Sequence, residues 1–186
     1  IAKPTEIELK ITGGLIAHYR DRGNVKVMLW KIGGASQTGE LVTLVAEDRS
    51  VPPDGKERTV KLAVKEAGLY KLTVSDGGDK TLVKFPDGLP LVVPSTEESP
   101  MNRFYSRWHM VFYVPKGTKV VGIFGGENGD VFDADGKKVF SFVGKKTSYY
   151  GIDVPAGQDG KVWRIKSAVG VVKLLTVPPY FSPSAR

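Results

Sequence analysis

The segment 102–114 carries the residues with the clearest capacity for chemistry, because aromatic and polar side chains alternate along it. In an extended strand, successive side chains point to opposite faces. One face then holds mainly apolar residues, and the other holds the set Tyr105, Arg107, His109, Val111 and Tyr113. Aromatic rings can stack on the C–H face of a sugar, while arginine and histidine can bond its hydroxyl or acid groups. Tyr105, Arg107, His109 and Tyr113 are therefore candidate ligand-binding residues, unless this face is ordinary surface or is covered by a neighbouring module.

Trp30 is a further candidate, in a different part of the chain. It lies in a predicted strand, Val25–Ile32, in which Val25, Val27 and Leu29 share one face. The indole must then point to the opposite face, where it is either buried against a second surface or exposed. An exposed indole would be a platform on which a sugar ring can stack.

The sequence lacks the motifs of the common catalytic and metal sites. Its two histidines, His18 and His109, do not form a zinc-binding pair, and neither a Gly-x-Ser-x-Gly elbow nor a cysteine is present. We therefore expect no catalytic residue, no metal ligand and no cofactor. Asp130, Asp133 and Asp135 leave two interpretations open: a hairpin in which Asp135 and Gly136 make the turn, or a structural calcium site.

The elements that must position these residues are predicted to be strands. Short stretches rich in Val, Ile, Phe, Tyr and Thr alternate with turn signals along the whole chain. Three similar phrases, which begin at Val51, Val114 and Val154, combine proline with glycine, and each is expected to end one strand and turn the chain toward the next. The pattern predicts an all-β fold of about fifteen strands, one of them at Leu15–Arg20.

The polar, acidic segment Pro94–Pro100 is the strongest candidate for a boundary between domains. It divides the chain into residues 1–98 and 99–186, each with the strand number and spacing of a small sandwich. We therefore predict two packed antiparallel β-sandwich modules, Ig-like or jelly-roll-like. The alternative is one continuous jelly-roll sandwich with a long loop between strands.

The composition narrows the range of partners. The net charge is +7, but the lysines are spread singly, so this charge is either diffuse and solubilising or gathered on a functional basic face. No nucleic-acid-binding motif is present, and no run of about 18 apolar residues could span a membrane. The chain starts at Ile1, so we expect an excised fragment or a processed product, and a signal peptide or catalytic domain can lie outside it.

Four segments carry a resemblance to a known class of domain. They are residues 112–118 (Phe-Tyr-Val-Pro-Lys-Gly-Thr), 131–137 (Val-Phe-Asp-Ala-Asp-Gly-Lys), 154–163 and 177–180. Together they resemble the C-terminal β-sandwich accessory domains, similar to carbohydrate-binding modules, of large secreted bacterial glycoside hydrolases and related exported proteins. The resemblance covers residues 104–184. It implies a non-catalytic module in a secreted or extracytoplasmic protein, and it supplies no binding residues.

These observations lead to three hypotheses. The leading one is a non-catalytic accessory region that binds a neutral or anionic polysaccharide through Trp30 and the candidate residues of segment 102–114, and that is linked to a catalytic domain. The second is a structural spacer or docking module that packs on a catalytic domain or another subunit. The third is a jelly-roll polysaccharide lyase, in which Tyr105, Arg107 and His109 abstract a proton and neutralise charge.

Overall fold

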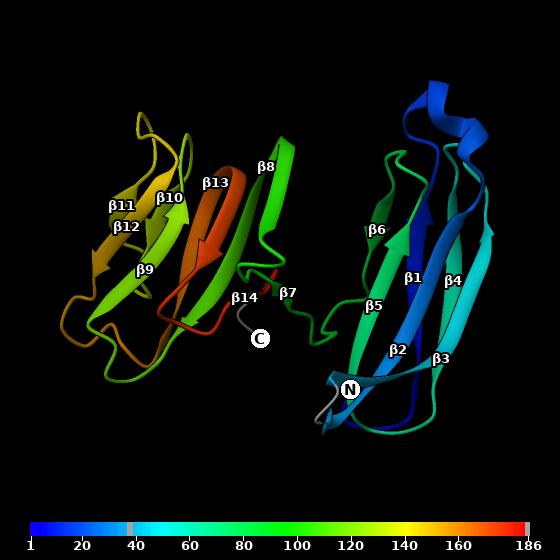
Figure 1. The fold of residues 1–186 in the computed structure, drawn as a ribbon, viewed down its shortest axis with the longest axis horizontal. Coiled ribbons are helices and arrows are strands. Elements are labelled where there is room, and N and C mark those ends of the chain that lie inside the picture. Colours follow the sequence, from blue (N-terminus) through cyan, green and yellow to red (C-terminus); the bar gives the residue numbers. More distant parts are fainter. Residues whose placement is uncertain (37–38, 185–186) are drawn as a thin grey trace. The chain divides into compact units, whose positions relative to one another are not determined.

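The protein is all-β, with antiparallel sheets and one short 3-10 helix (Figure 1). The computed structural model describes residues 1–36 and 39–184, and within them all side chains except those at 34–41 and 102–106. No helix in this described part is long and apolar enough to cross a membrane. The chain forms two compact units, Ile1–Pro90 and Leu91–Arg186.

The first unit contains two three-stranded antiparallel sheets that share one core. One sheet has the order β4 (Glu57–Val64), β1 (Thr5–Thr12), β6 (Leu82–Lys84), and the other has the order β3 (Gly39–Val51), β2 (Val25–Ser36), β5 (Leu69–Ser75). Alternate residues of these strands are apolar, so each sheet turns one apolar face inward. The most deeply buried members of this core include Leu9, Ile11, Val25, Val27, Val60 and Leu62.

The segment after β1 differs from the sequence prediction. A strand was expected at Leu15–Arg20, but the structure has a 3-10 helix, η1 (Ala17–Arg22). Gly14, at φ +75°, turns the chain out of β1, and its carbonyl accepts a hydrogen bond from Nε of Arg20 at 2.9 Å. The guanidinium of Arg22 lies 3.7 Å from the ring centre of Tyr19. These local contacts hold the segment in place without pairing to a neighbouring strand, so the prediction of a strand was wrong here.

The second unit is organised around one long strand, β13 (Lys161–Leu174). Its sheet has the order β11 (Lys138–Ser141), β10 (Asp130–Phe132), β13, β9 (Val120–Gly125), β12 (Ser148–Asp153), and β8 (Met101–Val114) also pairs with β13. β13 therefore has three partner strands, β8, β9 and β10. Figure 1 shows it beside β8. The core of the unit is rich in aromatic residues and includes Trp108, Phe112, Ile123, Phe142, Trp163 and Phe181.

The polar segment around Pro94–Pro100 is attached to the second unit. A short strand, β7 (Val93–Pro94), pairs with β14 (Tyr180–Phe181) near the C-terminus. The buried hydroxyl of Ser95 donates a hydrogen bond to the carbonyl of Val172 at 2.7 Å. The units are therefore divided after Pro90, whereas the sequence pattern placed the boundary between residues 98 and 99. Pairing between segments about 85 residues apart in the chain produces this difference, and local composition does not reveal it.

Two of the proline–glycine phrases are joined directly. The amide of Gly117 donates a hydrogen bond of 2.7 Å to a carboxylate oxygen of Asp159. This bond, more than any other interaction, lowers the pKa of Asp159 below its ordinary value. The turns that end β8 and precede β13 are thereby linked, which fixes the ends of these paired strands at the same edge of the unit.

Candidate functional site

Strand β8 presents the candidate side chains on its outer face. Trp108 and Phe112 are 3% and 2% exposed and belong to the core, as the alternation in the sequence predicted. Arg107, His109 and Tyr113 are exposed on the opposite face, with Tyr113 at 46%. Tyr105 lies in the same strand, but its side chain is outside the described residues. The structure thus brings three of the five candidate residues together on one face.

His109 is held in place by a β-bulge in the neighbouring strand. Met110 pairs with Ile165 and Trp108 with Ala168, so Lys166 and Ser167 together lie opposite His109. Ser167 has φ +56°, and its amide donates a hydrogen bond to Nδ1 of His109 at 3.1 Å. Because Nδ1 is the acceptor, the ring proton is on Nε2, from which it can be donated to a ligand.

The C-terminal segment runs along the edge of β8. The amide and carbonyl of Val111 both bond to Ser182, each at 2.8 Å, in an isolated antiparallel bridge. Val111 is consequently only 7% exposed, although its side chain lies on the same face as His109 and Tyr113. The face therefore has a covered apolar centre with polar and aromatic groups around it.

A hollow lies over the outer face of β10, β13 and β8. Phe132, Arg164 and Val111 are paired in one row across the three strands, and Val162 is paired with Tyr113 in an adjacent row. The hollow has a volume of about 190 Å³, and its lining includes Val111, Phe132, Val162, Arg164 and Lys166 together with residues of the turn after β10. We call these five residues the cationic hollow.

The cationic hollow has two positive side chains, Arg164 and Lys166, and the buried carboxylate of Asp133 also lines it. Nζ of Lys166 lies 4.9 Å from the ring centre of Phe132, in a cation–π contact. Among the described side chains, no carboxylate oxygen lies within 4.0 Å of the charged nitrogens of Arg164 or Lys166. The nearby carboxylate of Asp130 is 3.7 Å from Lys138 instead. Two cations therefore border the hollow without a bound counter-charge from the described part of the protein.

The acidic turn after β10 is a hairpin. Oδ1 of Asp133 accepts the amides of Asp135 and Lys137, and Gly136 makes the turn at φ +82°. The side-chain amide of the buried Gln158 donates to Asp135 and accepts from the amide of Ala134. These bonds agree with the hairpin interpretation, and the described residues contain no cluster of three or more ligand side chains that could hold a metal.

Trp30 belongs to the first unit, whereas the candidate residues of β8 belong to the second. Its side chain is half-buried, and its Nε1 donates a hydrogen bond of 3.3 Å to Oγ1 of Thr73. Across the sheet its neighbours are Leu44 on β3 and Lys71 on β5. The indole is therefore positioned by a neighbouring strand and remains partly accessible from the outside of the sheet.

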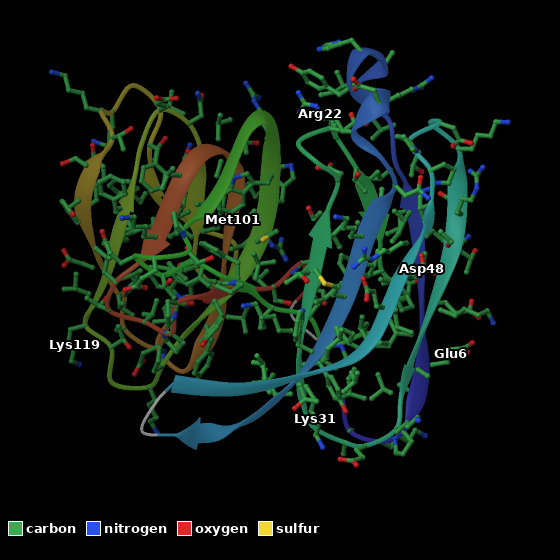
Figure 2. All side chains as sticks on the ribbon, turned by 45° about the vertical axis from the view of Figure 1, so that its right-hand side comes forward. Glu6, Arg22, Lys31, Asp48, Met101 and Lys119 are labelled. Carbon is green, nitrogen blue, oxygen red and sulfur yellow. The ribbon has the colours of Figure 1, made fainter. Side chains whose placement is uncertain are left out.

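The two sheets of the first unit have contrasting outer faces. The outer face of β4–β1–β6 is charged: Glu6 points outward from β1, and Lys61 bonds both Glu6 and Glu8, which raises the pKa of the lysine (Figure 2). The outer face of β3–β2–β5 has an apolar patch next to Glu47, Lys71 and Thr73. Its exposed members include Leu69 at 62%, Val42 at 43% and Leu44 at 41%. We call this second surface the apolar face of the first unit.

The sequence reasoning missed the residues of β10 and β13 that complete the site. Trp163 and Ile165 are 0% exposed, so alternation places Arg164 and Lys166 outside. That signal was available, but the sequence alone does not show that β10 and β8 pair on either side of β13. Tyr149, on β12, is 66% exposed, and its ring centre lies 5.0 Å from that of Phe124.

Comparisons with protein-family models, with curated proteins and with solved structures found no match to this chain. The candidate site is therefore interpreted from its own geometry and charge.

Proposed function

We propose that each unit is an antiparallel β-sandwich module and that the second one binds polysaccharide on the outer face of β8 and β13. The main observation in support is that Arg107, His109 and Tyr113 are exposed together on that face, beside the cationic hollow. A tyrosine ring can stack on a sugar ring, and the fixed Nε2–H of His109 and the guanidinium of Arg107 can bond its oxygens. In this proposal the chain is a non-catalytic accessory region of a secreted carbohydrate-active protein.

The module would act by raising local concentration. A module that holds a polymer keeps the next cleavage site near a catalytic domain linked to it, so the second encounter becomes intramolecular. No reacting group on the module is needed for this effect. Trp30, in the other unit, would offer a separate stacking surface on its partly accessible indole.

Affinity electrophoresis in gels that contain individual polysaccharides tests the proposal. Tyr113→Ala should weaken retention by about 3- to 10-fold, the effect expected when one aromatic stacking contact is lost. Tyr149→Ala is the matched control, because Tyr149 is also an exposed tyrosine of the second unit but lies on β12. If both variants are retained like the wild type, or only Tyr149→Ala is weakened, the assignment of the face is refuted.

A docking role is the second candidate, and the apolar face of the first unit favours it. Single exposed apolar residues are common, but neighbouring ones on one sheet are typical of surfaces that another protein covers. If docking is the function, no polysaccharide in the gel should slow the migration of the protein in affinity electrophoresis. Docking through this face also predicts that the double variant Leu44→Ser/Leu69→Ser binds less of an apolar dye such as ANS. Unchanged dye binding in that variant would argue against docking there.

A direct assay distinguishes the polysaccharide lyase from the non-catalytic module. A lyase acting on uronate polymers releases unsaturated products that absorb ultraviolet light, and the non-catalytic proposal expects no increase in absorbance. An increase that disappears in His109→Ala and Arg107→Ala would replace the proposal with the enzymatic alternative.

A further inference from the structure

Resting on the proposed polysaccharide-binding function, we infer that the cationic hollow is a subsite for an acidic group, and that the second unit selects polysaccharides that carry carboxylate or sulfate. The inference rests on the charge balance of the hollow, on its floor and on its size.

The charge balance of the hollow is incomplete within the described residues. Arg164 and Lys166 border the hollow without a carboxylate oxygen within 4.0 Å. Of the acidic side chains nearest to it, Asp130 lies opposite Lys166 but makes its ion pair with Lys138 through Oδ2, and Oδ1 of Asp133 accepts two backbone amides. The buried Oδ1 of Asp130 has no hydrogen-bond partner among the described residues. A bound anion would therefore supply the missing counter-charge, and a planar guanidinium suits the paired oxygens of a carboxylate or sulfate.

Asp135 is committed in the same way. It accepts a hydrogen bond from Gln158, and it lies 3.8 Å from Nζ of Lys161. The acidic residues of the turn after β10 thus fold the turn itself, and its described carboxylates do not reach Arg164 or Lys166.

The floor of the hollow combines apolar side chains with Arg164. Phe132 on β10 and Val111 on β8 flank Arg164 in one row of the sheet, and Val162 lies in the next row of β13, opposite Tyr113. Lys166 rests against the ring of Phe132, which limits the positions its ammonium group can take. Apolar side chains next to two cations match a sugar unit that has a C–H face and one acidic substituent.

The size of the hollow fits one unit of a chain better than a free ligand. Its volume of about 190 Å³ is below the range of roughly 300–1,000 Å³ that encloses drug-sized ligands. One sugar unit could place its acidic group there while the rest of the polymer crosses Tyr113 and His109. A nucleic acid would also bring anions, but it needs a basic track and several stacking rings, and this face offers a single hollow.

The test compares two matched pairs of polymers: polygalacturonate with its methyl ester, and dextran sulfate with dextran. The wild-type protein should be retained more strongly by the acidic member of each pair. In the variant Arg164→Gln/Lys166→Gln, retention by polygalacturonate should fall by about tenfold, and binding to the methyl ester should be unchanged. Both residues are exposed, so circular dichroism should show a folded protein.

A charge-matched control separates the hollow from the net charge. Lys119→Gln/Lys146→Gln also removes two positive charges, but from exposed turns of the second unit. Lys119 is labelled in Figure 2. This control should retain most of the wild-type preference for the acidic polymer. If it loses as much affinity as the variant of the hollow, binding is due to diffuse charge and the inference is overturned.

The remaining outcomes also decide the question. If acidic and neutral polymers are retained equally and the variant of the hollow binds like the wild type, the inference fails while the proposed function stands. If no polymer is retained, the proposed function fails as well. If single-stranded DNA is retained as strongly as polygalacturonate, with the same dependence on Arg164 and Lys166, selection for polysaccharide is refuted.

Discussion

Replacing His109 tests whether this residue holds the bulge of β13, contacts a ligand, or does both. In His109→Ala the amide of Ser167 loses the ring nitrogen that accepts its hydrogen bond at 3.1 Å. One such bond contributes about 0.5–1.5 kcal/mol to the free energy of unfolding. The histidine side of the bond is exposed, so water can replace part of it, and we expect a loss of about 1 kcal/mol.

The expected change in Tm follows from the size of the second unit, Leu91–Arg186. In a domain of 60–100 residues, a loss of 1 kcal/mol lowers Tm by about 4–8 °C. Tryptophan fluorescence can follow this unit during heating, because Trp108 and Trp163 are buried in its core. Trp30 reports on the other unit and serves as an internal reference.

His109→Asn is the matched variant. Its amide oxygen can occupy the position of Nδ1 and accept the bond from Ser167, so it should recover most of the lost stability. It cannot replace the donor at Nε2, so polysaccharide retention should stay reduced if His109 contacts the ligand. Equal Tm values for the wild type, the Ala variant and the Asn variant would refute the structural role. Full retention in both variants would refute the binding role.

Three further predictions concern stability. Gly14 and Gly88 have nearly equal φ angles of 75° and 77°. A Cβ added at Gly14 would lie 2.2 Å from the backbone carbonyl of Pro53, whereas a Cβ added at Gly88 would meet open space. In urea unfolding, Gly88→Ala should lower the free energy of unfolding by about 1–2 kcal/mol. Gly14→Ala should lower it by about 1–3 kcal/mol more. Equal losses in the two variants would contradict the predicted contact with Pro53. The hydrogen bond from the amide of Gly117 lowers the pKa of Asp159 in the folded protein. The stability that this bond contributes is therefore complete above the unfolded pKa of about 3.9, and it is lost as pH falls through the lower folded pKa. Between pH 7 and pH 3, Tm should therefore fall less in Asp159→Asn than in the wild type, and parallel curves would count against this bond. Gln158→Leu should lower the free energy of unfolding in urea by about 1–3 kcal/mol, because it removes two hydrogen bonds of the side chain, to Ala134 and Asp135, each worth about 0.5–1.5 kcal/mol. An unchanged midpoint would contradict this role.

Much of the second unit could be predicted from alternation. The side-chain period of two placed Trp108 and Phe112 inside and His109 and Tyr113 outside, because a strand leaves only two choices for each side chain. The same alternation accounts for the burial of Trp163, which is followed by the exposed Arg164. The all-β fold followed from strand-forming residues separated by turn signals.

What the sequence did not indicate depends on pairing between distant segments. Val111 has the pattern of an outward residue, yet Ser182 bonds its backbone and it is buried. The cationic hollow exists only because β10 and β8 lie on either side of Arg164. The 3-10 helix at Ala17–Arg22 was missed because hydrogen bonds from arginine side chains, and not an apolar periodicity, stabilise it.

The position of β13 also affects the order in which the protein can fold during synthesis. The six strands of the first unit are complete once residue 84 has been made. In the second unit, β8, β9 and β10 are made early, but each must wait for the same late partner, which ends at Leu174. Pairing between distant segments is slow to form, and unpaired strand edges favour aggregation. We therefore expect the first unit to fold while the second is still being translated. A ribosome stalled before residue 161 should carry a protease-resistant first unit and a protease-sensitive second one.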